Sequence, residues 1–187
     1  MSELQILIPM AGEGQRFRDH GYKTPKPLIP VNGIPMVVRT VLDLPQAYRH
    51  VFLVRASHIE EFAIDKELLK YFPKAIIVSI DELTSGQAST VRLGGNYLDP
   101  EKPVLVAACD STHVYDQANH DRLVKLGVDC LIWCFRNDSR VHHNPNAYGW
   151  IRTLGDKTIG VSCKIPISNQ ILLDHVVSGF FTFKSAK

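Results

Sequence analysis

Three glycines and four fixed cations lie in a short stretch near the start of the chain, MAGEGQRFRDHGYKTPKPL, at residues 10–28. Gly12 and Gly14 permit backbone conformations, and a close approach to a ligand, that a Cβ atom would prevent. Backbone N–H groups of such a loop can hold phosphate oxygens, and arginine and lysine can neutralise the phosphate charge. The cations are Arg16, Arg18, Lys23 and Lys26. The stretch therefore predicts a site for a phosphorylated ligand.

Two common phosphate-binding loops do not fit this stretch. A Walker loop ends in Gly-Lys-Ser or Gly-Lys-Thr, and neither tripeptide occurs here. A dinucleotide fingerprint has a third glycine three residues after Gly14, where this chain has Phe17, and we expect no helix to begin there. Taken alone, the glycine pair favours a solvated surface loop without a ligand. The choice between that loop and a phosphate site depends on the residues that surround the pair.

The segments around this loop predict an α/β fold. Short apolar runs alternate with amphipathic segments as far as Phe135, which is typical of a parallel sheet between layers of helices. Residues 11–32 show no periodicity and are expected to form a long loop, and a loop of that length is usually functional. Ser57 is the expected N-cap of the second helix. The expected strands are 4–9, 50–55, 74–80, 104–108 and 128–135, and the expected helices are 35–44, 58–72 and 85–93.

The end of the chain has a different pattern. After a polar, turn-rich segment, short strands are expected at 148–153, 158–164 and 176–183, which indicates an antiparallel or mixed half-sheet. We expect one domain over residues 1–187. Because the chain stops directly after a strand-like run, we also expect it to be truncated at its C-terminus.

Composition excludes several classes of protein. The chain is 45% hydrophobic and 21% charged, as in ordinary globular proteins. A formal net charge of +2 is too small to indicate a nucleic acid polymer or a membrane surface as a partner. We find no apolar run long enough for a membrane span and no secretory signal, so we expect a cytoplasmic protein. The four cysteines lack CxxC spacing, which favours buried reduced thiols over disulfides or a zinc site.

The longer pattern resembles the sugar-nucleotide nucleotidyltransferases. A strand is followed by A-G-x-G-x-R, then after eight residues by P-K-P-L, and then by V-N-G-x-P-M, over residues 6–36. This family of NDP-sugar pyrophosphorylases joins an NTP to a sugar 1-phosphate and releases pyrophosphate. The resemblance implies a Rossmann-like, three-layer α/β/α fold with a mixed, mainly parallel sheet. It also implies nucleotidyl transfer that depends on Mg²⁺.

The same resemblance implies roles for particular residues. Arg16 and Lys26 would hold the triphosphate and stabilise the departing pyrophosphate, and Asp110, after the central strand, would bind the metal. The residues implied to line the nucleotide are Ala11, Gly12, Gly14, Gly86, Gln87 and Ala88. Those implied to contact the sugar or its phosphate are Tyr148, Gly149, Lys164 and Gly179. Arg18 and Lys23 are expected to be solvated, and Cys109 is expected to pack in the core.

The chain also departs from the family pattern. Gln15 and Gln87 stand where the family commonly has Thr or Ser, so the base preference cannot be carried over. Lys164 lies in SCKIP instead of the common E-K-P, and residues 180–187 contain no acid that could be a second metal ligand. Three functions therefore stay open: sugar-1-phosphate nucleotidyltransferase, cytidylyltransferase acting on an alcohol phosphate such as phosphocholine, and nucleotide-binding domain without turnover. The expected partners are an NTP and a sugar 1-phosphate, and a homo-oligomer is compatible with all three.

Overall fold

The computed structural model describes residues 3–187, which form two compact units. The first unit comprises the chain up to Leu131 together with Phe181–Lys187, and the second comprises Ile132–Phe180. Strand β10 (His175–Phe183) begins in the second unit and ends in the first. The division therefore does not test the expectation of a single domain, which stays a prediction.

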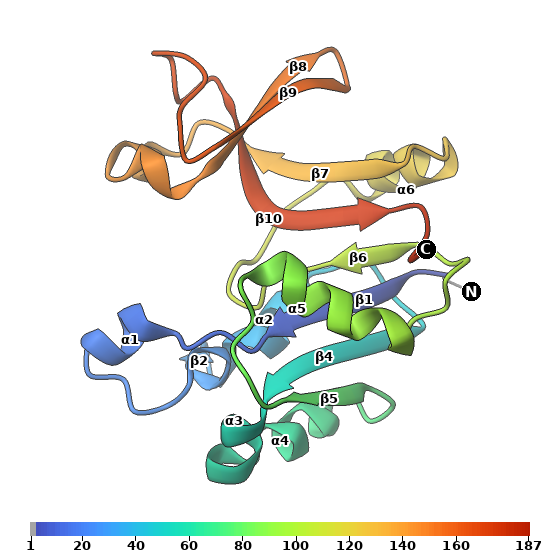
Figure 1. Ribbon diagram of the computed structural model, residues 1–187. Coiled ribbons are helices and arrows are strands. Elements are labelled where there is room, and N and C mark those ends of the chain that lie inside the picture. Colours follow the sequence, from blue (N-terminus) through green and yellow to red (C-terminus); the bar gives the residue numbers. More distant parts are fainter. Residues whose placement is uncertain (1–2) are drawn as a thin grey trace. The chain divides into compact units, whose positions relative to one another are not determined.

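A mainly parallel sheet forms the centre of the first unit (Figure 1). Its strands are β1 (Gln5–Met10), β4 (Arg49–Arg55), β5 (Ile76–Ile80) and β6 (Val104–Val106). They lie in the order β5-β4-β1-β6 and are all parallel, while the last three residues of β10 pair antiparallel with β6. From β1 the chain adds β4 and then β5 on one side, and β6 then pairs with the opposite side of β1. This reversal places a topological switch point between β1 and β6.

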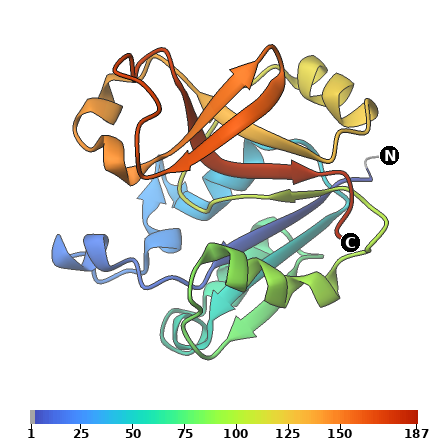
Figure 2. The same cartoon turned by 45° about the horizontal axis from the view of Figure 1, so that its top comes forward.

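Burial on both faces explains why these strands are apolar throughout. Ile6 and Ile8 point to opposite faces from Leu7, yet all three are at most 1% exposed. Helix α5 (Gln87–Gly94) covers one face of the sheet and α2 (Met36–Leu42) covers the other (Figures 1 and 2). A Cβ on Gly94 would lie 2.6 Å from Cδ1 of Leu7, so this glycine allows α5 to approach β1. The predicted α/β fold class is confirmed.

The expected loop at residues 11–32 is wrong in part, because it contains short elements. These are α1 (Gln15–Asp19), the 3-10 turn η1 (Lys26–Leu28) and β2 (Pro30–Val31), which pairs with β3 (Ile34–Pro35). A helix therefore does begin just after Gly14, contrary to the expectation. None of the residues of α1 is buried, so no hydrophobic periodicity marks it.

The expected helix at 58–72 is two helices, α3 (Ala56–Phe62) and α4 (Ile64–Tyr71). Ala63 separates them with a left-handed φ of 49°, a conformation that sequence periodicity does not reveal. Ser57 lies inside α3, and Arg55 occupies the N-cap position, so the predicted cap is wrong. A 3-10 turn, η2 (Gly95–Tyr97), follows α5.

Helix α6 (Gln117–Lys125) was not expected from the sequence. Its N-cap is Asp116, whose carboxylate accepts a hydrogen bond from the backbone N–H of Asn119 at 3.0 Å. His120 is its one buried residue. The helix therefore lacks the apolar stripe by which the other helices were predicted from the sequence.

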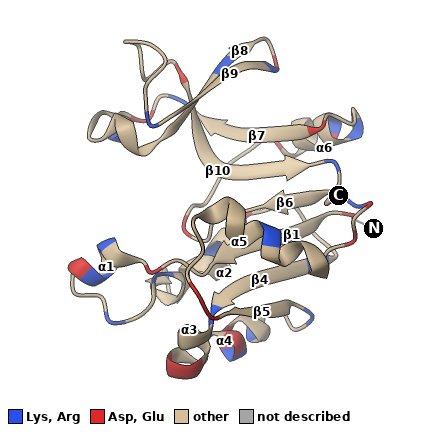
Figure 3. Ribbon diagram, in the orientation of Figure 1, with Lys and Arg blue, Asp and Glu red and all other residues tan. Residues whose placement is uncertain are grey.

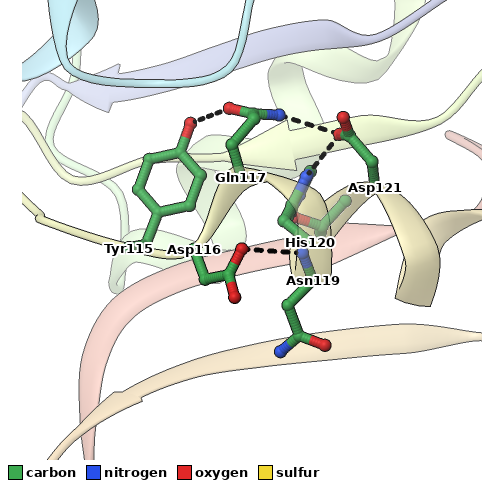
Figure 4. A network of polar contacts seen from close by, with 7 residues as sticks. Tyr115, Asp116, Gln117, Asn119, His120 and Asp121 are labelled. Carbon is green, nitrogen blue, oxygen red and sulfur yellow. Dashed lines mark hydrogen bonds and ion pairs between the residues drawn. The ribbon is translucent and has the colours of Figure 1, made fainter.

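A chain of polar contacts stabilises the first turns of α6 (Figure 4). The hydroxyl of Tyr115 donates to Oε1 of Gln117 at 2.6 Å, and Nε2 of Gln117 donates to Oδ1 of Asp121 at 2.8 Å. The same carboxylate oxygen lies 3.4 Å from Nδ1 of His120. Side-chain hydrogen bonds thus take the place of apolar packing as the local determinant of this helix.

The second unit is built on antiparallel strands, as expected. Strands β8 (Gly149–Leu154) and β9 (Lys157–Cys163) form a hairpin, and β10 pairs antiparallel with β8. Strand β7 (Cys130–Phe135) pairs with β10. The core of the unit contains Val141, Trp150 and Val176, and Nε1 of Trp150 donates to the carbonyl of Pro145 at 3.2 Å. Two 3-10 turns connect β7 to β8: η3 (Ser139–His142) and η4 (Pro145–Ala147).

Two expectations from composition can also be compared with the structure. No helix within residues 3–187 has the length and apolar character needed to cross a membrane. All four cysteines are free thiols, as expected, but none is fully buried: Cys109, Cys130 and Cys134 are partly buried, and Cys163 is exposed on β9.

Candidate functional site

A cavity of about 490 Å³ lies in the first unit at the carboxyl ends of β1 and β6. Open α/β sheets bind ligands at this edge, outside a switch point, and the volume lies in the usual range for small-molecule sites. The residues that line the cavity are Pro9, Met10, Ala11, Gly12, Gly14, Gln15, Arg16, Phe17, Lys26, Pro27, Leu83, Thr84, Gly86, Gln87, Thr90, Ala108, Cys109 and Asp110.

The glycine loop (residues 11–14) forms one wall of this cavity. Gly14 has a φ of 64°, and a Cβ there would lie 3.3 Å from Cβ of Lys26, so the turn and its close neighbour both favour glycine. A Cβ on Gly12 would meet no atom within 4 Å. Packing therefore does not require glycine at position 12, and the space beside its backbone is open for a ligand.

Lys26 and Asp110 form an ion pair inside the cavity, between Nζ and Oδ2, although they lie 84 residues apart in the sequence. The ammonium also lies 5.4 Å from the centre of the Phe17 ring, a cation–π contact. The side chains of Lys26 and Asp110 are 19% and 32% exposed. The cation predicted to bind phosphate is thus held in a fixed position between a carboxylate and an aromatic ring.

The opposite wall is the segment that leads into α5. The hydroxyls of Thr84 and Thr90 lie 2.6 Å apart, and both contact the carbonyl of Gly86, at 3.1 and 3.2 Å. These contacts fix the backbone beside Gln87, whose side chain can both donate and accept hydrogen bonds. Ala88, predicted with them, is not among the residues that line the cavity.

Cys109 lies next to Asp110 but is unsuited to act as a nucleophile. Burial raises the pKa of its thiol to about 12, and the neighbouring Asp110 carboxylate acts in the same direction. The thiol is therefore protonated at neutral pH, and only a thiolate is a strong nucleophile. Cys109 is only partly buried and lines the cavity, so its expected packing in the core is met only in part.

The structure thus brings the predicted residues Arg16, Lys26 and Asp110 to one cavity, together with five of the six residues implied to line the nucleotide. Sequence reasoning missed Phe17, Thr84 and Thr90. An aromatic residue and two threonines carry no spacing that marks a site. Only their positions could have suggested them: Phe17 lies within the predicted loop, Thr84 just before the third predicted helix, and Thr90 within that helix.

The residues predicted to contact the sugar phosphate lie in the second unit. Gly149 pairs with Cys163 at the start of the hairpin, and the backbone N–H of Lys164 donates to the carbonyl of Tyr148 at 2.9 Å. Lys164 and Gly179 both have a positive φ, 61° and 89°. Their role toward a sugar phosphate stays a prediction.

A larger hollow, of about 710 Å³, lies elsewhere in the first unit, at Leu4 and Pro103, where β1 and β6 begin. This is the edge opposite the one where open α/β sheets bind ligands, so the smaller cavity is the better candidate. Within residues 3–187, no three His, Cys, Asp or Glu side chains converge as a metal-binding cluster. A cation at Asp110 would therefore take its other ligands from substrate and water.

Comparison with known proteins identifies the family of the chain. The family model described as the MobA-like NTP transferase domain matches residues 6–153. No curated protein sequence matches the chain. The nucleotidyltransferase resemblance found in the sequence is thereby confirmed at the level of the NTP transferase domain.

Three solved structures share the fold. A nucleoside-diphosphate-sugar pyrophosphorylase from Vibrio cholerae is 22% identical, with a TM-score of 0.71 over 96% of this chain and 73% of the other. A Bacillus anthracis protein, named as a glucose-1-phosphate thymidylyltransferase and solved with sucrose, is 17% identical, with a TM-score of 0.78 over 98% and 72%. An inositol-1-phosphate CTP transferase from T. maritima is 14% identical, with a TM-score of 0.72 over 96% and 70%.

Proposed function

We propose that this chain, which belongs to the MobA-like NTP transferase domain family, joins an NTP to a sugar 1-phosphate to give an NDP-sugar and pyrophosphate. One observation carries the proposal: the glycine loop, Arg16, Lys26 and Asp110 line a single cavity at the carboxyl ends of β1 and β6. This places a loop suited to phosphate, two cations and a carboxylate around the same space.

The proposed reaction needs no activated serine or cysteine. A phosphate oxygen of the sugar 1-phosphate attacks the α-phosphorus of the NTP, the new P–O bond forms, and the bond to pyrophosphate breaks. The obstacle is electrostatic, because an anion approaches a highly charged triphosphate. Arg16 offers a planar fork for two phosphate oxygens, and Lys26 offers a compact charge. Both would stabilise the charge that develops on the departing pyrophosphate.

Asp110 is the residue that would hold a magnesium ion. Its carboxylate faces the cavity, and a single carboxylate completed by substrate and water oxygens suits Mg²⁺, which keeps several waters in proteins. When bound, Mg²⁺ would supply neutralisation of phosphate charge. The Mg²⁺ requirement is part of the proposal.

We assign the nucleoside contacts to residues of the first unit and the sugar contacts to residues of the second. The wall at Gly86 and Gln87 would contact the nucleoside, through backbone groups and the side-chain amide of Gln87. Tyr148, Gly149, Lys164 and Gly179 would contact the sugar and its phosphate. The proposed setting is the cytoplasm, in the supply of activated sugars for polysaccharide synthesis.

A second candidate function keeps the chemistry and changes the acceptor to an alcohol phosphate. The fold shared with an inositol-1-phosphate CTP transferase supports this alternative. A third candidate, nucleotide binding without turnover, is motivated by the lack of an acid in residues 180–187.

Pyrophosphate release separates these functions. The full chain is incubated with Mg²⁺ and each common NTP, together with either sugar 1-phosphates or alcohol phosphates such as phosphocholine. We expect release with a sugar 1-phosphate and its loss in Asp110→Asn. Release with alcohol phosphates alone would establish the second candidate function instead.

A thermal-shift series tests nucleotide binding independently of turnover. A nucleotide at about a hundredfold excess over its Kd should stabilise the fold by about 2.7 kcal/mol. If a nucleotide stabilises the protein but no acceptor gives pyrophosphate, the third function holds. If no NTP or NDP-sugar raises the melting temperature, the proposal is wrong.

A further inference from the structure

A second cavity, of about 160 Å³, adjoins the glycine loop in the first unit. It shares Gly14, Phe17 and Lys26 with the larger cavity. Its other lining residues come from the glycine loop, from α1 and the segment after it, from the end of β4 and from α3. They are Glu13, Arg18, Lys23, Thr24, Pro25, Arg55, Ser57, His58, Glu61 and Phe62.

The charges around this small cavity favour an anion. Four of its lining residues are arginine or lysine and two are glutamate. Figure 3 shows basic and acidic residues next to each other on α1, the helix that contributes Arg18 to the cavity. Since a water molecule takes about 30 Å³ of liquid, the cavity has room for about five waters. That volume suits a phosphate group and is too small for a nucleotide.

A carboxylate of the chain already sits between two of these cations. Oε1 of Glu13 lies 3.4 Å from Nη1 of Arg55 and 3.7 Å from Nη2 of Arg18. Both distances exceed the 2.7–2.9 Å of a strong charge-assisted hydrogen bond. The two guanidinium groups therefore hold one oxyanion loosely and keep donor capacity for another.

His58 supplies an unused polar atom at the same place. Its Nδ1 is buried and has no hydrogen-bond partner in the structure. Burial lowers the pKa of His58, and the positive charges of Arg55 and Arg18 lower it further, while Glu61 opposes them. The imidazole is thus neutral at physiological pH and can donate one N–H to an anion.

We propose that this cavity is a second oxyanion site, in which Arg55, Arg18 and His58 bind orthophosphate or pyrophosphate after the anion displaces the carboxylate of Glu13. The site is separate from the nucleotide cavity, because none of these three residues lines that cavity. The two are nevertheless coupled through the backbone. Glu13 lies between Gly12 and Gly14, so its displacement changes the loop that forms a wall of the nucleotide cavity.

Direct binding of inorganic anions tests the site without nucleotide or turnover. Isothermal titration calorimetry of the full chain is carried out with sodium orthophosphate and, separately, with sodium pyrophosphate. Arg55→Gln should weaken binding by about tenfold or more, since it removes a charge-assisted contact. Arg49→Gln is the matched control, because Arg49 lies at the opposite end of β4 and should leave the affinity unchanged.

Glu13→Gln gives a result in the opposite direction. It removes the competing carboxylate, so the anion should bind about two- to fivefold more tightly, the scale of a partly exposed ion pair. Arg55→Gln could lose affinity only because the variant is less stable. Tighter binding by Glu13→Gln cannot have that cause, because a folding defect weakens binding. Melting temperatures of all variants are compared alongside.

Arg16→Gln separates this site from the nucleotide cavity. In the Arg16→Gln protein, adding Arg55→Gln should still weaken the binding of orthophosphate or pyrophosphate. The proposal is overturned if Arg55→Gln weakens the binding of neither anion, or if Glu13→Gln leaves the affinity of both unchanged. Failure of nucleotidyl transfer would not affect these measurements, so the two proposals can fail separately.

Discussion

Lys26→Ala is the most informative perturbation of the nucleotide cavity. It removes a cation that the structure holds on two sides, by the ion pair with Asp110 and by the ring of Phe17 at 5.4 Å. If Lys26 stabilises charge on the departing pyrophosphate, its loss acts on the transition state more than on the bound substrate. We therefore expect kcat to fall, with a smaller change in KM.

The position of the side chain decides the size of this effect. A flexible, solvated lysine would contribute at the scale of a surface ion pair, about 0.2–1 kcal/mol, or at most about fivefold in rate. Lys26 is only 19% exposed and is fixed before the substrate arrives. Removing one preorganised group that stabilises charge costs about 10²–10³ in kcat, equivalent to about 2.7–4 kcal/mol. The two scales are far enough apart to be distinguished.

The assay is initial-rate pyrophosphate release over a range of NTP concentrations, with the acceptor that the wild-type protein uses. Lys74→Ala is the control, because Lys74 is an exposed lysine of the same unit that lines neither cavity of the glycine loop. A Lys26→Ala enzyme within about fivefold of wild type would refute the reasoning. So would a loss confined to KM, since it would mean that Lys26 binds substrate and transition state equally.

Two further predictions concern the fold around the site. Gly94→Ala should lower the free energy of unfolding by about 1–3 kcal/mol in urea denaturation, because the new Cβ would lie 2.6 Å from Cδ1 of the buried Leu7. Gly95→Ala, where a Cβ meets nothing within 4 Å, should be neutral or slightly stabilising, and equal effects at the two positions would contradict the packing argument. The thiol of Cys109 should make stability fall between about pH 9 and pH 12, because its pKa is raised from 9.0 to about 12 and only the unfolded chain loses the proton in that window. The slope is at most about 1.4 kcal/mol per pH unit, and comparing denaturation of wild type and Cys109→Ala at pH 8 and pH 10 should show that the variant lacks it.

The sheet of the first unit could be predicted because its strands are buried on both faces. Leu4–Pro9 is a continuous apolar run, and the structure places β1 at Gln5–Met10, between β4 and β6. The missed helices fail the same criterion. Helix α1 buries no residue, and α6 buries only His120 and depends on its N-cap and side-chain hydrogen bonds. Elements that are determined by polar contacts leave no periodic trace in the sequence.

The candidate site was predictable only where a motif marks it. The glycine loop and its cations stand out by residue type and spacing. Asp110 follows an ordinary strand, and its predicted role depends on the family resemblance and on its place at the carboxyl end of that strand. No spacing in the sequence could show that Lys26 and Asp110 meet across 84 residues. The ring of Phe17 and the hydroxyls of Thr84 and Thr90 became visible only through their contacts.

The strand order gives the physical reason for that meeting. Because β1 and β6 are parallel neighbours, the segments that follow them leave the sheet at the same edge, and each brings one member of the ion pair. An anionic ligand that binds Lys26 would share its charge with Asp110, and a half-buried carboxylate with less counter-charge is costly. On the proposed function, binding of a phosphorylated substrate at Lys26 would therefore favour a second cation beside Asp110. The pair also explains why neutralising either residue should impair the site more than removing a solvated charge from the same loop.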